Sequence, residues 1–138
     1  MLARSERFPL AKADETGHLA AMPASVLIVD DDAEFRSLAG LLLRSRGYEI
    51  VGESVDAASA VDAAMALQPT AILLDVNLPD HDGFWVAETL SEAGIRSRIV
   101  LTSSAMTDVS SGTLERCGAV AFVAKTDLAT VDLADLLR

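Results

Sequence analysis

Five polar side chains each stand directly after a short apolar run of this sequence. Asp30 and Asp31 follow the first run, and Asp75 follows a later one. A hydroxyl group, on Thr102, and an amine, on Lys125, follow two more. If these runs are strands of one parallel sheet, their carboxyl ends lie at the same edge, where such sheets bind ligands. The five side chains would then converge on one shallow site.

Three carboxylates, a hydroxyl and an ammonium group define the chemistry that such a site can carry out. Carboxylates at one edge repel each other, and a bound divalent cation offsets that repulsion. Carboxylate and carbonyl oxygens favour octahedral Mg²⁺, with ligand distances of about 2.1 Å. A carboxylate oxygen can also attack phosphorus, while Mg²⁺, an ammonium group and a hydroxyl donor stabilise the charge of the transferring group. Asp75, Lys125 and Thr102 therefore indicate Mg²⁺-dependent phosphoryl transfer.

Apolar runs and helical stripes alternate along the chain. Each predicted strand is a nearly continuous apolar run, which is typical of a parallel sheet covered on both faces. The alternation predicts a doubly wound α/β fold with five strands and right-handed crossovers. The predicted strands are Val26 to Val29, Tyr48 to Glu53, Ala71 to Leu74, Ile99 to Leu101 and Val120 to Val123. Helical positions are Phe35, Leu38, Ala39 and Leu42, then Ala57 to Leu67, then Val86, Ala87 and Leu90, and finally Ala129, Leu133, Leu136 and Leu137.

Length and composition limit the classes of protein to which the chain can belong. With 138 residues, of which 51% are hydrophobic and 23% charged, it fits one globular domain. A formal net charge of −10 argues against direct nucleic-acid binding, and no apolar run is long enough for a membrane span. The single cysteine, Cys117, and the lack of a secretory signal favour the cytoplasm. We expect a flexible extension over residues 1–24 and the domain over residues 25–138.

Four motifs that carry these residues resemble one known family. VDDD contains Asp30 and Asp31, LLDVNLPDHDG contains Asp75, IVLTSS contains Thr102, and FVAK contains Lys125. In this order and spacing they resemble the receiver domain of bacterial response regulators, and the similarity covers residues 26 to 138. The resemblance implies a flavodoxin-like sheet with the strand order 2-1-3-4-5. It also implies phosphorylation of Asp75 in two-component phosphorelay signalling.

The resemblance assigns further roles at the same edge. Asp31, Asp75 and the backbone carbonyl of Asn77 would hold Mg²⁺, and Asp30 would act largely through a water. Phe122, three residues before Lys125, lies where the family has its aromatic switch residue. Thr102 would move towards the phosphoryl group when the ring of Phe122 turns inward. Asn77 and Ser104 correspond to positions that tune the lifetime of the acyl phosphate.

The resemblance also implies partners. A histidine kinase or phosphotransfer protein, or a small acyl phosphate, would supply the phosphoryl group. A downstream protein would bind the face built from the fourth helix, the fifth strand and the fifth helix, and a phosphorylation-dependent dimer is compatible with this. We expect a single-domain regulator that catalyses only its own phosphorylation and dephosphorylation. The segment from Thr107 to Gly118 contains poor helix formers, which predicts a weak or mobile fourth helix.

Two other functions and several structural interpretations compete with this one. The first is an Mg²⁺-dependent phosphohydrolase with an aspartyl nucleophile, because the acids after the first strand loosely resemble the DxD element of haloacid-dehalogenase-like enzymes. The second is a degenerate receiver that serves only as an interaction module. Among single residues, Asp32 is expected to cap the first helix and His81 to lie exposed in a loop. Phe84 and Trp85 are expected to serve in packing.

Overall fold

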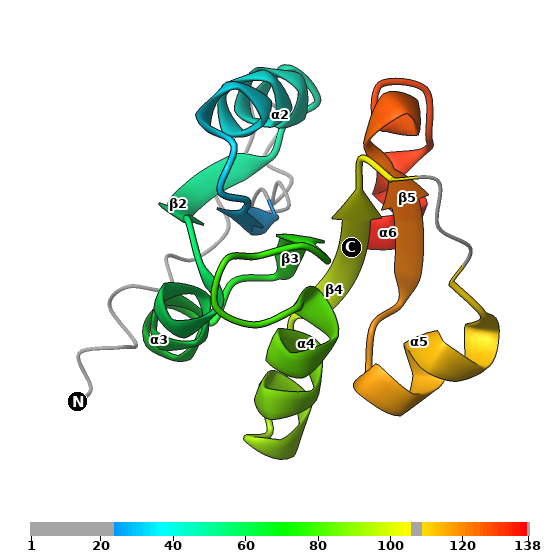
Figure 1. Ribbon diagram of the computed structural model, residues 1–138. Helices are drawn as coiled ribbons and strands as arrows, with labels where there is room; N and C mark the ends of the chain where they lie inside the picture. Colours follow the sequence, from blue (N-terminus) through cyan, green and yellow to red (C-terminus); the bar gives the residue numbers. More distant parts are fainter. Residues whose placement is uncertain (1–23, 106–108, 138) are drawn as a thin grey trace, which may run out of the picture.

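The computed structural model describes residues 24–105 and 109–137. Residues 1–23 of the expected N-terminal extension lie outside the described part. Five parallel strands form one sheet in the order β2-β1-β3-β4-β5, which confirms the predicted fold (Figure 1). The strands are β1 Ser25–Val29, β2 Glu49–Ser54, β3 Ala71–Asp75, β4 Arg98–Ser103 and β5 Ala121–Ala124. The helices are α2 Ala33–Ser45, α3 Ala57–Leu67, α4 Gly83–Glu92, α5 Ser111–Cys117 and α6 Leu133–Leu137, with a 3₁₀ turn, η1, at Lys125–Asp127.

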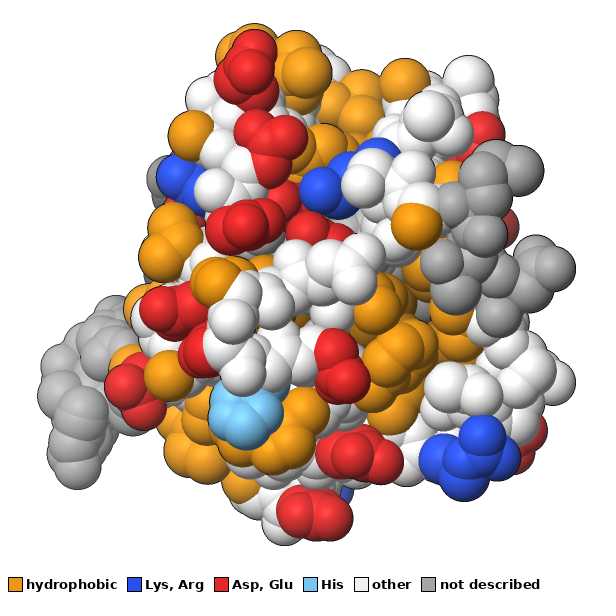
Figure 2. Space-filling view, in the orientation of Figure 1, with side chains coloured by type: hydrophobic (Ala, Val, Ile, Leu, Met, Phe, Trp, Pro, Cys, Tyr) orange, Lys and Arg blue, Asp and Glu red, His pale blue; other side chains and the backbone are white. Residues whose placement is uncertain are grey.

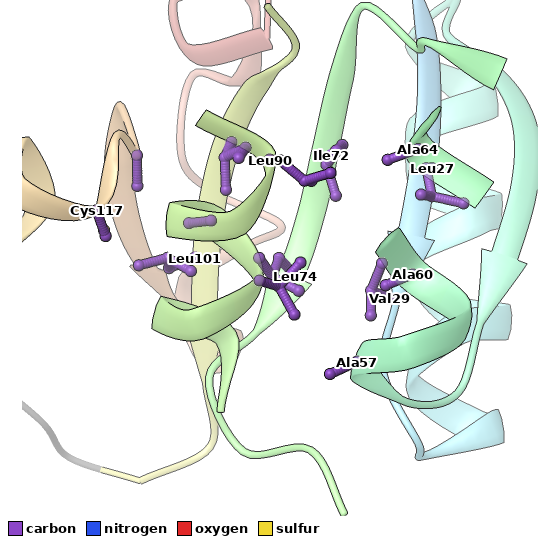
Figure 3. Close-up of a cluster of buried hydrophobic side chains, with 14 residues drawn as sticks. Leu27, Val29, Ala57, Ala60, Ala64, Ile72, Leu74, Leu90, Leu101 and Cys117 are labelled. Atoms are coloured by element: carbon purple, nitrogen blue, oxygen red, sulfur yellow. The ribbon is translucent and has the colours of Figure 1, made fainter. Parts of the chain in front are cut away.

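Helices cover both faces of the sheet, and each face has its own hydrophobic core. On one face, α3, α4 and α5 pack against β1, β3 and β4 through small and branched side chains (Figures 1 and 3). On the other face, α2 and α6 pack against the same strands. The central strands β1 and β3 contribute to both cores, which is why their sequences are uninterrupted apolar runs. The direct pairing of β1 with β3 places the ends of both strands side by side.

Short polar side chains begin most of the helices. Asp32 caps α2 by accepting hydrogen bonds from the backbone N–H groups of Glu34 and Phe35, as expected from the sequence. Asp56, Asp82 and Ser110 cap α3, α4 and α5 in the same way. Because β1 ends at Val29 and α2 begins at Ala33, only three residues separate them, and all three are acids.

The last helix is shorter than its apolar stripe predicts. The stripe begins at Ala129, but α6 begins at Leu133. The guanidinium group of Arg46 donates to the backbone carbonyls of Ala129 and Val131, which holds this segment outside the helix. The Asp132 carboxylate accepts a hydrogen bond from the N–H of Ala134 at 3.1 Å, at the start of α6. Here a tertiary contact overrides the helical periodicity.

Other local expectations meet mixed results. The composition of Thr107 to Gly118 predicts a weak fourth helix, and α5 is indeed only seven residues long, while residues 106–108 lie outside the described part. Phe84 packs against the core as expected. Trp85 is 37% exposed, and its ring stacks instead on His81 with ring centroids 4.0 Å apart. His81 is exposed, as expected.

Candidate functional site

The three acids Asp30, Asp31 and Asp75 meet at the carboxyl ends of β1 and β3. Each offers a carboxylate oxygen, and these oxygens all lie within 4.8 Å of one another. The two strands are direct neighbours in register, with Val29 opposite Leu74, so residues that follow them must be close. Asp30 and Asp75 are buried, whereas Asp31 is exposed. The site is therefore open to solvent on the side of Asp31.

Lys125 reaches this cluster from the end of β5. Its Nζ lies 2.7 Å from Asp30 Oδ2 and 3.4 Å from Asp75 Oδ2. Burial lowers the pKa of the Lys125 ammonium, but the close ion pair with Asp30 and the negative charge of Asp75 outweigh it, so the pKa is raised. The lysine thus carries its positive charge beside both buried carboxylates.

The Asp75 carboxyl has a raised pKa, and burial is the main cause. The N–H of Asn77, which donates to Asp75 Oδ1 at 3.1 Å, acts in the opposite direction. The negative charge of Asp30 raises the pKa further, and Lys125 lowers it. Burial and repulsion by Asp30 together disfavour the ionised form of the Asp75 carboxyl. A cation bound at the cluster would stabilise that ionised form.

Thr102 is the neighbour of Asp75 across the sheet. The register of β3 and β4 sets Asp75 opposite Thr102. The threonine is buried, and its Oγ1 has no hydrogen-bond partner among residues 24–105 and 109–137. Buried hydroxyl groups are normally paired, because an unpaired one costs about 1–3 kcal/mol. A buried donor without a partner beside a carboxylate fits a site whose ligand brings its own oxygen atoms.

The loop between β3 and α4 is held by contacts that sequence reasoning missed. The Asp80 carboxylate accepts hydrogen bonds from the N–H groups of Ala57, at 2.8 Å, and Ala58, at 3.0 Å. These bonds, that of Ala57 first, lower the pKa of the Asp80 carboxyl. The contact ties the loop that contains Asn77 to the beginning of α3. An Asp in a polar loop gives no sign of a partner 23 residues away, so no signal in one sequence could have found it.

Gly83 is required by the close approach of α4 to the end of β3. A Cβ atom at this position would lie 2.5 Å from the backbone oxygen of Asp75. The Gly83 N–H donates to the carbonyl of Val76 at 2.7 Å, which draws the start of α4 against the end of β3. The glycine in the LPDHDG segment therefore allows the loop to fold back over Asp75.

Two residues expected to modulate the site lie further out. Asn77 is exposed, and its Nδ2 lies 3.4 Å from the hydroxyl of Ser103, a residue that sequence reasoning left without a role. Ser104 is also exposed. It lines a hollow of about 620 Å³ together with Phe122, whose ring is partly buried against the core below α5. The structure thus groups Ser104 with Phe122, at the rim between α5 and η1.

The donor set fits a magnesium ion. Asp30, Asp31 and Asp75 supply carboxylate oxygens, the ligand type that Mg²⁺ prefers, and Lys125 neutralises only part of their charge. Acidic side chains are also more widespread than basic ones on the face that Figure 2 shows. These three acids could hold the ion, which would supply positive charge to an incoming anion.

A parallel α/β sheet that gathers two buried acids, a hydroxyl and a lysine at its carboxyl edge is the arrangement expected of a receiver domain. The chain belongs to the response regulator receiver domain family, which matches residues 26–137. A transcriptional regulatory protein, PdtaR of Mycobacterium tuberculosis, is 37% identical over 109 residues, covering 77% of this chain and 51% of the relative. A protein-glutamate methylesterase/protein-glutamine glutaminase of Archaeoglobus fulgidus is 36% identical over 115 residues, covering 82% and 33%.

The solved structures agree with this assignment. The response regulator domain of Thermotoga maritima CheB superposes with a TM-score of 0.68 at 27% identity, covering 80% of this chain and 84% of that chain. The chain spans about half the length of the PdtaR relative and a third of the methylesterase. Among the described residues, none of the helices is both long and apolar enough to cross a membrane.

Proposed function

We propose that this receiver domain accepts a phosphoryl group on Asp75 in a two-component phosphorelay. The single observation that carries the proposal is the buried constellation around Asp75. An acid neighbour in Asp30, an ammonium in Lys125 and an unpartnered hydroxyl in Thr102 all lie beside one carboxylate. A structural acid at a strand end needs none of these.

The positions of these groups support the following reaction. A carboxylate oxygen of Asp75 attacks phosphorus, the new O–P bond forms, and the bond from phosphorus to the leaving group breaks. The leaving group, an imidazole of a donor histidine or the carboxylate of a small acyl phosphate, departs with the electron pair. Lys125 and Thr102 then donate to the phosphoryl oxygens. Mg²⁺ held by the acids would offset the negative charge that the donor brings.

Mass spectrometry after incubation with acetyl phosphate and Mg²⁺ tests this proposal. We expect the mass of one phosphoryl group to be added, and chelation of the metal should prevent it. Asp75→Asn should abolish labelling, whereas Asp62→Asn, which changes an exposed acid on α3, should not. Labelling of Asp75→Asn with the same chemical stability would contradict the assignment. Turnover of a generic phosphomonoester would instead indicate a phosphohydrolase.

The lifetime of the phosphorylated state offers a second measurement. The acyl phosphate is lost when water attacks phosphorus in line, so side chains at the mouth of the site control access. Asn77 is the first candidate and Ser104 the second. Exchange of Asn77 for the bulkier, uncharged Leu should change the decay rate of phosphorylated protein while Mg²⁺ affinity changes little, since the proposed metal contact is a backbone carbonyl. Unchanged decay in variants of both residues would remove them from this role.

Two classes of protein would bind this domain: the donor of the phosphoryl group and a downstream target. A histidine kinase or a phosphotransfer protein would supply the phosphoryl group. The downstream partner would bind the face of α5, β5 and α6, where the hollow beside Phe122 lies. The link from Asp75 to this face would run through Thr102 of β4, which pairs with Val123 of β5. Dimerisation after phosphorylation would use the same face.

A further inference from the structure

An aromatic ring covers the ammonium group of Lys125. Nζ lies 4.5 Å from the centroid of the Phe35 ring, above its face. The same Nζ lies 2.7 Å from Asp30 Oδ2 and 3.4 Å from Asp75 Oδ2. The side chain of Lys125 is only 14% exposed. The ammonium is therefore enclosed by two carboxylates and one ring, with little contact to water.

The position of Phe35 follows from how α2 begins. Asp32 caps the helix, and its carboxylate accepts a hydrogen bond from the N–H of Phe35 itself. The first turn of α2 is thereby fixed directly beside the acids. Arg36, the next residue, donates to the backbone carbonyl of Asp30 at 2.7 Å and to the Glu53 carboxylate at 2.9 Å. These contacts hold the start of the helix, and with it the ring, over the end of β1.

The ring and the carboxylates act on the ammonium in different ways. A carboxylate attracts the ammonium and also accepts one of its three N–H donors. An aromatic face attracts a cation through its quadrupole but takes up no conventional hydrogen-bond donor, and the attraction grows when the cation is shielded from water. Phe35 can therefore hold Lys125 in place and leave its N–H groups free for another oxygen. A leucine at this position would fill the space without attracting the charge.

We infer that Phe35 is a positioning residue for Lys125, holding its ammonium at the acceptor site through a cation–π contact while its N–H groups remain available to an incoming phosphoryl oxygen. The contact itself is independent of the proposed function, but its effect on phosphorylation rests on that function. The alternative is that the ring only fills the core between α2 and the sheet, where it also packs. The two roles differ in one respect: a cation–π contact depends on the electron density of the ring face, whereas simple packing depends only on the shape of the ring.

Site-specific fluorination of Phe35 separates the two roles, because fluorine withdraws electron density from the ring face and changes its shape little. We expect the rate of phosphorylation by acetyl phosphate, at saturating Mg²⁺, to fall stepwise with each added fluorine, reaching about fivefold with pentafluorophenylalanine. Phe35→Leu should show a similar loss of rate, whereas Phe35→Tyr should retain most of the wild-type rate. Equal rates across the fluorinated series would overturn the inference.

A matched control is available in the same core. Tyr48 is a partly buried aromatic residue that packs against the same cluster as Phe35, away from the acids. Tyr48→Leu should leave the phosphorylation rate within about twofold, because it removes an aromatic ring without removing a partner of Lys125. A loss in Tyr48→Leu equal to that in Phe35→Leu would show that general packing, and not the ring over Lys125, controls the rate.

Nuclear magnetic resonance of the metal-free protein gives a readout that needs no phosphorylation. Protons beside the face of an aromatic ring are shifted upfield by its ring current, so the Cε protons of Lys125 should resonate upfield of those of a free lysine. The shift should disappear in Phe35→Leu and persist in Phe35→Tyr. A wild-type protein without the shift would overturn the contact. A wild-type protein with the shift that is not labelled by acetyl phosphate would overturn the proposed function and leave the contact established.

Discussion

Lys125 is bound more closely to Asp30 than to Asp75, with Nζ 2.7 Å from the first carboxylate and 3.4 Å from the second. Asp30 is completely buried. A buried carboxylate without a positive partner is costly, so the ion pair with Lys125 offsets part of the cost of burying Asp30. The lysine therefore supports the structure of the acid cluster as well as any transfer chemistry.

Removal of the lysine charge should destabilise the metal-free protein. We expect Lys125→Met to lower the free energy of unfolding by about 3 kcal/mol in the presence of a chelator, because it leaves a buried carboxylate without its partner. Mg²⁺ should recover part of this loss, since the ion supplies positive charge to the same acids. Urea denaturation with and without Mg²⁺ measures both effects.

Two variants control this measurement. Arg96→Met removes an exposed cation and should change the free energy of unfolding by less than about 0.5 kcal/mol. The double variant Lys125→Met with Asp30→Asn should regain much of the lost stability, because it removes both members of the pair. A single Lys125→Met variant as stable as Arg96→Met would contradict the structural role of the lysine.

The raised pKa of Asp75 predicts a pH dependence of stability in the absence of metal. Burial raises the pKa of this carboxyl above its ordinary value of 3.8. Its stabilising contribution is then complete below the ordinary value and is lost as pH rises through the raised value. Asp75→Asn is uncharged throughout, so we expect a higher melting temperature than wild type at pH 7 and no difference once Asp75 is protonated.

Calorimetry between pH 3 and 8 with a chelator present measures this difference. Asp62→Asn, an exposed acid on α3, controls for the loss of one negative charge from a chain with a net charge of −10. Equal gains in the two variants would mean that overall charge, and not the burial and repulsion at the cluster, is responsible.

Sequence patterns predicted the sheet and the place of the site because both depend on short-range rules. Buried parallel strands must be apolar on both faces, so β1 and β3 stand out from their neighbours, and Asp30 and Asp75 lie at their ends. The neighbouring position of β1 and β3 came from the resemblance, since periodicity does not give strand order. Once that order is known, the proximity of Asp30 and Asp75 follows, whereas Lys125 reaches both acids from β5 through its long side chain.

Contacts between side chains and distant backbone could not be predicted. Arg46 binds the backbone carbonyls just before α6, and Asp80 binds the start of α3 from the loop of Asn77. Neither residue differs from an ordinary surface charge in the sequence. The ring of Phe35 fits the helical stripe whether or not a lysine lies beneath it. Such contacts depend on rotamers and on the approach of separate elements, which a one-dimensional pattern does not contain.

Gly83 and Gly40 should respond in opposite ways to substitution by alanine. A Cβ on Gly83 would lie 2.5 Å from the backbone oxygen of Asp75, so the start of α4 must move. We expect Gly83→Ala to cost about 2–3 kcal/mol and to weaken Mg²⁺ binding. Gly40 lies inside α2, where its nearest neighbour is the flexible end of Arg44 at 3.1 Å, so Gly40→Ala should be neutral or stabilising by up to about 1 kcal/mol.

Thermal denaturation and magnesium titration of the two glycine variants provide the comparison. The single tryptophan, Trp85, lies in the first turn of α4 and serves as a fluorescent reporter of both transitions. If Gly83→Ala folds and binds Mg²⁺ as well as Gly40→Ala, then the close approach of α4 to Asp75 is not required for the site.

Removal of the unpartnered hydroxyl of Thr102 should stabilise the unmodified protein but abolish its response to a bound phosphoryl group. Thr102→Val keeps the shape of the side chain and removes a buried donor that has no partner among the described residues. We therefore expect the unmodified protein to be stabilised by about 1 kcal/mol. The response to beryllofluoride, a mimic of the phosphoryl group, should be lost. In the wild-type protein Thr102 would move towards the mimic to donate a hydrogen bond, and this movement would vacate space for the Phe122 ring. Valine cannot donate, so neither movement is expected in the variant.

Hydrogen exchange with and without beryllofluoride measures the switch. In the wild-type protein, changes in protection should extend from Thr102 through α5 to Thr126, because α5 is short and can rearrange at low cost. Thr89→Val, a partly buried threonine on α4, should leave that response unchanged. Wild-type changes confined to the neighbourhood of Asp75 would mean that the domain signals by another route. A full response in Thr102→Val would mean that the hydroxyl is not the link between Asp75 and Phe122.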